Sequence, residues 1–160
     1  MEKAADKIKT KAEAKAIVDG WKKQGLKVVF TNGCFDILHL GHVDYLEKAR
    51  SLGDKLVLGL NTDDSVSRIK GPSRPIQDEN SRAHILASLQ FIDLVVFFNE
   101  DTPLDLISTL IPQILVKGSD YLAENIVGAD VVKSNGGVVK TIEFVPGYST
   151  TKIVEKIKST

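Results

Sequence analysis

Short apolar runs alternate along the chain with segments in which apolar residues recur every three or four positions. The apolar runs are rich in β-branched residues and mostly uninterrupted, which is typical of strands buried on both faces of a sheet. We predict strands at residues 27–31, 55–60, 94–98, 114–116 and 138–144. Helical periodicity predicts helices at residues 41–52, 64–69, 81–91, 103–110, 129–134 and 150–157. This alternation predicts an α/β fold, with a Rossmann-like, doubly wound, parallel five-stranded sheet in three α/β/α layers.

Two segments stand outside this alternation. Residues 3–24 carry the pattern of one helix that ends at Gly25, so we expect a helical extension over residues 1–26 and a main domain over residues 27–160. Residues 70–80 form the longest irregular stretch and contain two prolines, which predicts a partly stiff flap beside an active site.

The composition limits the kinds of binding partner that we expect for this chain. The chain has 160 residues, and its 21 Lys and Arg residues balance 21 Asp and Glu residues. A chain of this length is typical of a single domain. Its balanced charge gives no overall basic surface, which non-specific nucleic-acid binding needs. No apolar run approaches the roughly 20 residues of a membrane span, and the N-terminus lacks the apolar stretch of a secretory signal. With a single cysteine, these features predict a cytoplasmic protein that acts on small molecules, not on nucleic acid or membranes.

The strongest chemical signal is the segment of residues 31–42, Thr-Asn-Gly-Cys-Phe-Asp-Ile-Leu-His-Leu-Gly-His. It joins the first predicted strand to a predicted helix, and the start of a helix offers unpaired N–H groups and a positive dipole end. Gly33 and Gly41 would let a bulky anion approach the backbone, and His39 and His42 would add imidazole donors. We interpret the segment as a cradle for a polyphosphate.

Three further strand ends carry polar or glycine-containing turns. Ligands of open parallel sheets bind beyond the carboxyl ends of the strands, so these turns are expected near the cradle. They hold Asn61 to Asp63, Lys117 to Tyr121, and Tyr148 to Thr151, and the last group opens the final helix. Hydroxyls, lysines and a second helix start favour phosphate binding at this edge.

Other site types are disfavoured. The chain has no G-x-G-x-x-G after the first strand, no P-loop and no G-x-S-x-G elbow, which argues against a nicotinamide site, a P-loop NTPase and a serine hydrolase. His39 and His42 are spaced like a metal pair, but a zinc site needs a third ligand and His84 lies in another helix, so we expect no protein metal site. Cys34 lacks a matching base and is read as a small buried residue.

The chain resembles the H-x-G-H nucleotidyltransferases. The resemblance rests on Gly33-x-Phe35-Asp36-x-x-His39-x-Gly41-His42 and on Ser149-Thr150-Thr151. Within that superfamily it is most similar to the adenylyltransferase domain of ADP-heptose synthase, over residues of about 27–158. This closer similarity rests on Asn61-Thr62-Asp63, Lys70-Gly71-x-x-Arg74-Pro75, Asn80-Ser81-Arg82, Glu100-Asp101-Thr102-Pro103 and Val116-Lys117-Gly118-x-Asp120-Tyr121.

The resemblance implies transfer of AMP from ATP to D-glycero-β-D-manno-heptose 1-phosphate, which gives ADP-heptose for lipopolysaccharide synthesis and releases pyrophosphate. It also implies Mg²⁺ bound mainly through the ATP phosphates, a homodimer and, because no kinase precedes the domain, a separate sugar kinase. The implied catalytic residues are His39, His42 and Lys70. The implied nucleotide-binding residues are Gly33, Cys34, Phe35, Gly41, Arg82, Lys117, Gly118, Asp120, Tyr148, Ser149, Thr150 and Thr151. The implied substrate-binding residues are Asp36, Asn61, Asp63, Lys70 and Arg74.

Two alternatives stay open. A cytidylyltransferase acting on glycerol 3-phosphate, or on a similar small phosphate ester, would share the phosphate chemistry and differ in its base and acceptor pockets. A non-catalytic nucleotide-binding module would keep the helix starts, but it would not need the cations of the 70–80 flap.

Overall fold

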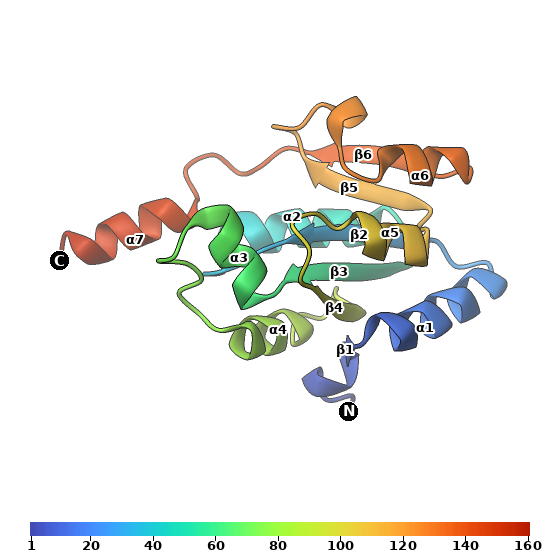
Figure 1. Ribbon diagram of the computed structural model, residues 1–160, viewed down its shortest axis with the longest axis horizontal. Helices are drawn as coiled ribbons and strands as arrows, with labels where there is room; N and C mark the ends of the chain where they lie inside the picture. The colour runs from blue at the N-terminus through green and yellow to red at the C-terminus, as the bar shows by residue number, and fades with distance from the viewer.

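One parallel sheet of six strands forms the centre of the computed structural model, which describes residues 1–160, and helices lie on both of its faces (Figure 1). The spatial order of the strands is β1-β4-β3-β2-β5-β6. The strands are β1 (Ile8–Lys9), β2 (Val28–Gly33), β3 (Lys55–Asn61), β4 (Leu94–Phe98), β5 (Ile114–Gly118) and β6 (Val138–Ile142). The α-helices are α1 (Lys11–Lys23), α2 (Leu40–Ser51), α3 (Asp63–Lys70), α4 (Glu79–Ala87), α5 (Leu104–Leu110), α6 (Ala129–Ser134) and α7 (Thr150–Lys158).

The core consists of two apolar layers, one on each face of the sheet. One layer joins residues of α1, α5 and α6 to the strands, and the other joins residues of α2 and α4 to the opposite face. Consecutive side chains of a strand alternate between these layers: Phe30 and Val57 belong to the first, and Val29 and Leu56 to the second. The predicted three-layer α/β/α architecture is confirmed.

The sheet reverses its order beside β2. The chain steps outward from β2 to β3 and β4, then returns to place β5 on the other side of β2, where Phe30 pairs with Leu115. Helices that follow strands on the two sides of such a point cover opposite faces, which leaves a crevice at the carboxyl ends of the two central strands. The fold therefore places β2 and β5 around a ligand-binding position.

The N-terminal segment differs from the prediction. In place of one helix over residues 3–24, the chain forms a 3₁₀ turn (Ala4–Lys7), the short strand β1 and then α1. β1 adds a sixth strand, since Ile8 pairs with Val95 at the edge of β4. The interruption has a local cause: the Thr10 hydroxyl accepts the Glu13 N–H while the Glu13 carboxylate accepts the Thr10 N–H, and this capping box begins α1 at Lys11.

Other boundaries moved by a few residues. The helix predicted at 81–91 is α4 and ends at Ala87, the strand predicted at 138–144 is β6 and ends at Ile142, and the irregular flap is 71–78. The helix predicted at residues 103–110 is α5 and begins one residue later, with Pro103 as its N-cap. None of the helices combines the length and the apolar character that a membrane span requires.

Helix α7 extends away from the rest of the molecule and ends at the C-terminus, at the left of Figure 1. None of its residues is buried. Its first residues nevertheless reach the central crevice, because the segment after β6 returns to the carboxyl edge of the sheet before α7 begins.

Candidate active site

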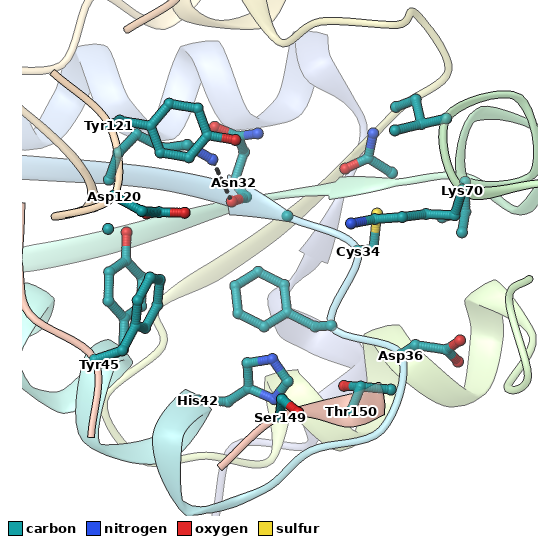
Figure 2. Close-up of a pocket in the computed structure, with 18 of the residues that line it drawn as sticks. Asn32, Cys34, Asp36, His42, Tyr45, Lys70, Asp120, Tyr121, Ser149 and Thr150 are labelled. Atoms are coloured by element: carbon teal, nitrogen blue, oxygen red, sulfur yellow. Dashed lines mark hydrogen bonds between the residues drawn. The ribbon is translucent and has the colours of Figure 1, made fainter. Parts of the chain in front are cut away.

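A large pocket opens at the carboxyl ends of β2 and β5, where the strand order reverses (Figure 2). Its volume is about 860 Å³, which is within the range of natural small-molecule sites. It gathers side chains from strand ends and helix starts that are distant in the sequence. Most of the predicted site residues line it: Gly33, Cys34, Phe35, Asp36, His39, His42, Asn61, Lys70, Arg74, Lys117, Gly118, Asp120, Tyr148, Ser149, Thr150 and Thr151.

The two histidines stack at the start of α2. His39 is the N-cap and His42 lies in the first turn, with ring centroids 3.8 Å apart and 24° between the ring planes. Gly41 does not line the pocket, but it makes this packing possible. A Cβ atom there would lie 2.9 Å from Cε1 of His39, so a larger residue would displace the His39 ring, while Cβ of Tyr148 at 3.5 Å would be in ordinary contact.

In each imidazole, one ring nitrogen has no hydrogen-bond partner. Nδ1 of His39 and Nδ1 of His42 are buried without a partner. Buried polar atoms are normally paired, so two unpaired nitrogens are unusual for residues of purely structural role and distinguish both rings from ordinary helix-start residues. Burial lowers the pKa of both rings. The pKa of His42 falls to about 4, with a further decrease from the neighbouring His39 and an opposing effect of the Ile37 backbone.

The start of α7 meets the start of α2 at the same pocket. Ser149 caps α7 by accepting the Lys152 N–H at 3.1 Å. The Thr150 hydroxyl donates to the Ile37 carbonyl at 3.3 Å, which ties α7 to the loop that leads into His39. His42, Ser149 and Thr150 all line the pocket, and Figure 2 shows them at the same border of it. Two helix N-termini, each able to bind an anion, therefore converge on one cleft.

The turn between β2 and α2 has a strained conformation. Phe35 has a φ of +46°, a left-handed value that non-glycine residues rarely adopt, and its ring is 8% exposed. The ring packs over Gly33, where a Cβ would lie 2.7 Å from it, and lies 5.3 Å from the His42 ring. This packing compensates the backbone strain and places the Phe35 ring against the His42 ring.

Two lysines reach the pocket from opposite walls. Lys117 donates to the Asn32 carbonyl at 3.3 Å and lies 5.2 Å from the centre of the Tyr121 ring, and burial lowers its pKa. Lys70, the last residue of α3, extends toward Cys34 (Figure 2). Burial raises the pKa of the Cys34 thiol, so this cysteine stays protonated and is a poor nucleophile.

Asp36 anchors the flap. Its carboxylate accepts the Ile76 and Gln77 backbone N–H groups at 2.8–2.9 Å and lies 3.5 Å from the guanidinium of Arg74. The resemblance implies that Asp36 binds the substrate. The carboxylate is instead occupied by the protein, and it holds the segment that carries Arg74 against the β2 turn.

Arg82 and Asp63 do not line the pocket, so their implied roles in nucleotide and substrate binding stay predictions. The arginine is 1% exposed. It donates to the carbonyls of Gln77, Cys34 and Asn61 and to the Asp63 carboxylate at 2.8–3.0 Å. Four of its N–H groups are thus used to join the flap, the β2 turn, the end of β3 and the start of α3.

The structure adds lining residues to which the sequence analysis assigned no individual role. They are Asn32, Tyr45, Val66, Ile69, Asp101, Thr102, Pro103, Tyr121, Asn125, Ile126, Val127 and Phe144. Tyr45 had a usable signal, because it follows His42 by three positions and therefore shares its helix face. The segment of residues 125–127 carried none, since its place in the pocket depends on how the chain returns after β5.

The lowered pKa of His42 predicts proton uptake when a triphosphate binds. A polyanion beside the ring should raise its pKa from about 4 toward or above the ordinary 6.5, so binding near pH 6 should take up as much as about one proton at His42. Calorimetric titration with ATP in two buffers of different ionisation enthalpy measures this uptake. His42→Ala should remove it, and equal uptake by the two proteins would contradict the assignment.

By the same linkage, the free protein should lose stability as pH falls from 6.5 toward 4, because only the unfolded chain binds the proton readily.

Comparison with known proteins agrees with this geometry. The sequence pattern of the Cytidylyltransferase-like family matches residues 30–156. The chain is 60% identical over 151 residues to the bifunctional protein HldE of Geobacter metallireducens and 58% identical over 151 residues to that of Syntrophotalea carbinolica. Each match covers 94% of this chain and 31% of the relative, so the chain spans about a third of the length of these relatives.

A solved structure extends the comparison to the fold. The lipopolysaccharide core biosynthesis protein from Thermoplasma volcanium superposes with a TM-score of 0.60 and 32% sequence identity. The superposition covers 76% of this chain and 98% of that protein. The H-x-G-H segment, the converging helix starts and these matches agree. The chain belongs to the Cytidylyltransferase-like family and is a nucleotidyltransferase.

Proposed function

We propose that the chain transfers AMP from ATP to D-glycero-β-D-manno-heptose 1-phosphate, giving ADP-heptose and pyrophosphate. The observation that carries the proposal is the convergence of two helix N-termini, one with stacked neutral imidazoles and one with a hydroxyl cluster, on a pocket that also receives Lys70. The choice of a heptose phosphate rests on the sequence resemblance to the adenylyltransferase domain of ADP-heptose synthase. The similarity to HldE proteins and to a lipopolysaccharide core biosynthesis protein supports it.

The reaction would be an in-line attack by an oxygen of the sugar phosphate on the α-phosphorus of ATP, with pyrophosphate as the leaving group. The attacking phosphate is already an anion, so the site needs no general base, and the main barrier is repulsion between two anions. Donors at the two helix starts would offset that repulsion. In this arrangement His42 donates at the α-phosphate, and Ser149, Thr150 and Thr151 bind the β- and γ-phosphates.

The donor set fits a magnesium ion that arrives with the nucleotide. Asp36 is occupied by flap N–H groups and Asp101 by Arg68, which leaves Asp120 as the pocket carboxylate without an ion pair. A magnesium ion coordinated mainly by phosphate oxygens would supply charge neutralisation between the two anions. The family resemblance also implies a homodimer, which we propose and which the mass in solution would test.

Pyrophosphate release tests the proposal. The protein is incubated with heptose 1-phosphate or glycerol 3-phosphate, each with ATP and with CTP. We expect release with ATP and the heptose phosphate, and activity with CTP alone would establish a cytidylyltransferase instead. ATP binding without turnover on any acceptor would favour a non-catalytic nucleotide-binding module.

Lys70→Ala is expected to impair use of the sugar phosphate more than binding of ATP. Arg74 is already close to Asp36, so Lys70 is the freer cation on the acceptor side of the pocket. Losing it should raise KM for the sugar phosphate or lower kcat by at least about tenfold, as expected when one charged contact to an anion is lost. Steady-state kinetics with each substrate varied in turn measure the difference.

A matched control is Lys48→Ala on α2. Lys48 forms an exposed pair with Asp44 and does not line the pocket, so its loss should leave both substrates unaffected. A defect confined to ATP affinity in Lys70→Ala would contradict the assigned role.

A further inference from the structure

An aromatic pair closes the pocket at the end away from the flap. Phe144, in the segment between β6 and α7, stacks on Tyr45 of α2 with ring centroids 5.6 Å apart and 28° between planes. Figure 2 shows Tyr45, Asp120 and Tyr121 together at one end of the pocket, while Lys70 and Asp36 lie at the other. The two ends of the cleft therefore differ in chemistry, because only the first carries aromatic rings, beside Asp120 and Lys117, while the second carries Lys70 and the Asp36–Arg74 pair.

The Tyr45 ring of the pair is rigidly held. Tyr45 is 5% exposed, and its hydroxyl lies 2.8 Å from Oγ1 of Thr31. The Thr31 hydroxyl gives its single proton to the Val116 carbonyl at 3.0 Å, so Tyr45 must be the donor toward Thr31. This chain joins α2, β2 and β5 and fixes the plane of the Tyr45 ring.

The position of the Phe144 ring depends on Gly118. A Cβ at Gly118 would lie 2.2 Å from Cζ of Phe144 and 2.3 Å from its Cε2, so the Phe144 ring occupies the space where any other residue would place a side chain. Phe144 nevertheless remains 49% exposed and lines the pocket. One side of the ring thus rests on Gly118 and Tyr45, and the rest of it is available to a ligand.

We propose that Phe144, supported by Tyr45 and Gly118, is the stacking surface for the nucleobase. The inference rests on the proposed function in taking ATP as the nucleotide. With the triphosphate at the histidines and at Ser149–Thr151, the base has one aromatic end of the pocket to occupy, because the opposite end carries Lys70 and Arg74. Aromatic rings bind bases through their π-faces, and the ordered ring loses little conformational entropy on binding.

Equilibrium titrations with ATP, AMP and inorganic tripolyphosphate test this role. Phe144→Ala should weaken ATP and AMP binding by about ten- to a hundredfold, the usual effect of removing a stacking ring, and leave tripolyphosphate binding within about twofold. Phe144→Tyr should restore ATP affinity. Gly118→Ala should displace the ring and reproduce the selective loss, and the double variant Gly118→Ala/Phe144→Ala should be no worse than either single variant.

Val138→Ala is the matched control, because Val138 lies on β6, is 45% exposed and does not line the pocket. Unchanged ATP affinity in Phe144→Ala would overturn the inference. So would an equal loss for tripolyphosphate, which would mean that Phe144 only positions the segment leading to Ser149. These outcomes do not depend on turnover: a protein that binds AMP through Phe144 but forms no ADP-heptose would refute the proposed reaction alone. A wild-type protein that binds no adenine nucleotide would overturn both.

Discussion

Replacing His42 by alanine is expected to lower the turnover number at least a hundredfold while the protein still binds ATP. The ring is stacked 3.8 Å from His39 in the first turn of α2, and its buried Nδ1 has no partner in the free protein. A donor held in place at the α-phosphate acts on charge that develops in the transition state. Removing one such donor usually costs about 10²–10³ in rate. Steady-state kinetics measure kcat, and equilibrium titration measures ATP affinity.

His84→Ala provides the control for this experiment. His84 is the third histidine of the chain, lies exposed on α4 and interacts through its Nδ1 with the Asn80 carbonyl at 2.8 Å. Its replacement should leave turnover unchanged. Unchanged turnover in His42→Ala would contradict the proposed role in the transition state, and a raised KM for ATP with unchanged kcat would assign the ring to ground-state binding.

The sequence was informative wherever the relevant contacts are local. The run at residues 55–60 was predicted as a strand because continuous β-branched and apolar side chains pack against both layers of the core, and the structure places β3 there. The H-x-G-H segment was informative for the same reason. Gly41 makes its close contact with His39, two residues away, so spacing alone indicated a special turn at a helix start.

Long-range contacts explain what the sequence reading missed. β1 is a strand because the edge of β4 is available to Ile8, and nothing near Ile8 encodes that partner. The capping box of Thr10 and Glu13 was a visible local signal that the helix begins later, and it was overlooked. Phe144 entered the site through contact with Gly118 and Tyr45, which lie far from it in the sequence.

Replacing Arg82 is expected to have a large effect on stability. The contacts of Arg82 are also long-range, so the sequence alone did not show them. Arg82→Met keeps the volume of the side chain but leaves the Cys34, Asn61 and Gln77 carbonyls without their donor and Asp63 without its cation. Breaking a buried charge network from one side costs about 3–5 kcal/mol, and because the Asp63 side chain is 38% exposed we expect the lower end, about 3 kcal/mol, or a fall in Tm of roughly 10 °C for a domain of this size. Thermal and denaturant unfolding measure both quantities.

Two further variants separate this structural role from a role in binding ATP. Arg82→Lys keeps the charge, but one ammonium group cannot replace a planar fork that reaches four acceptors, so it should destabilise the protein nearly as much as Arg82→Met. Arg68→Met removes an arginine whose partner Asp101 is 72% exposed, and it should cost no more than about 1 kcal/mol. An Arg82→Met protein that unfolds at the wild-type midpoint but binds ATP much more weakly would place the guanidinium on the triphosphate after all. The side chain would then have to leave its four acceptors when the nucleotide binds, and the flap and the end of β3 would move with it.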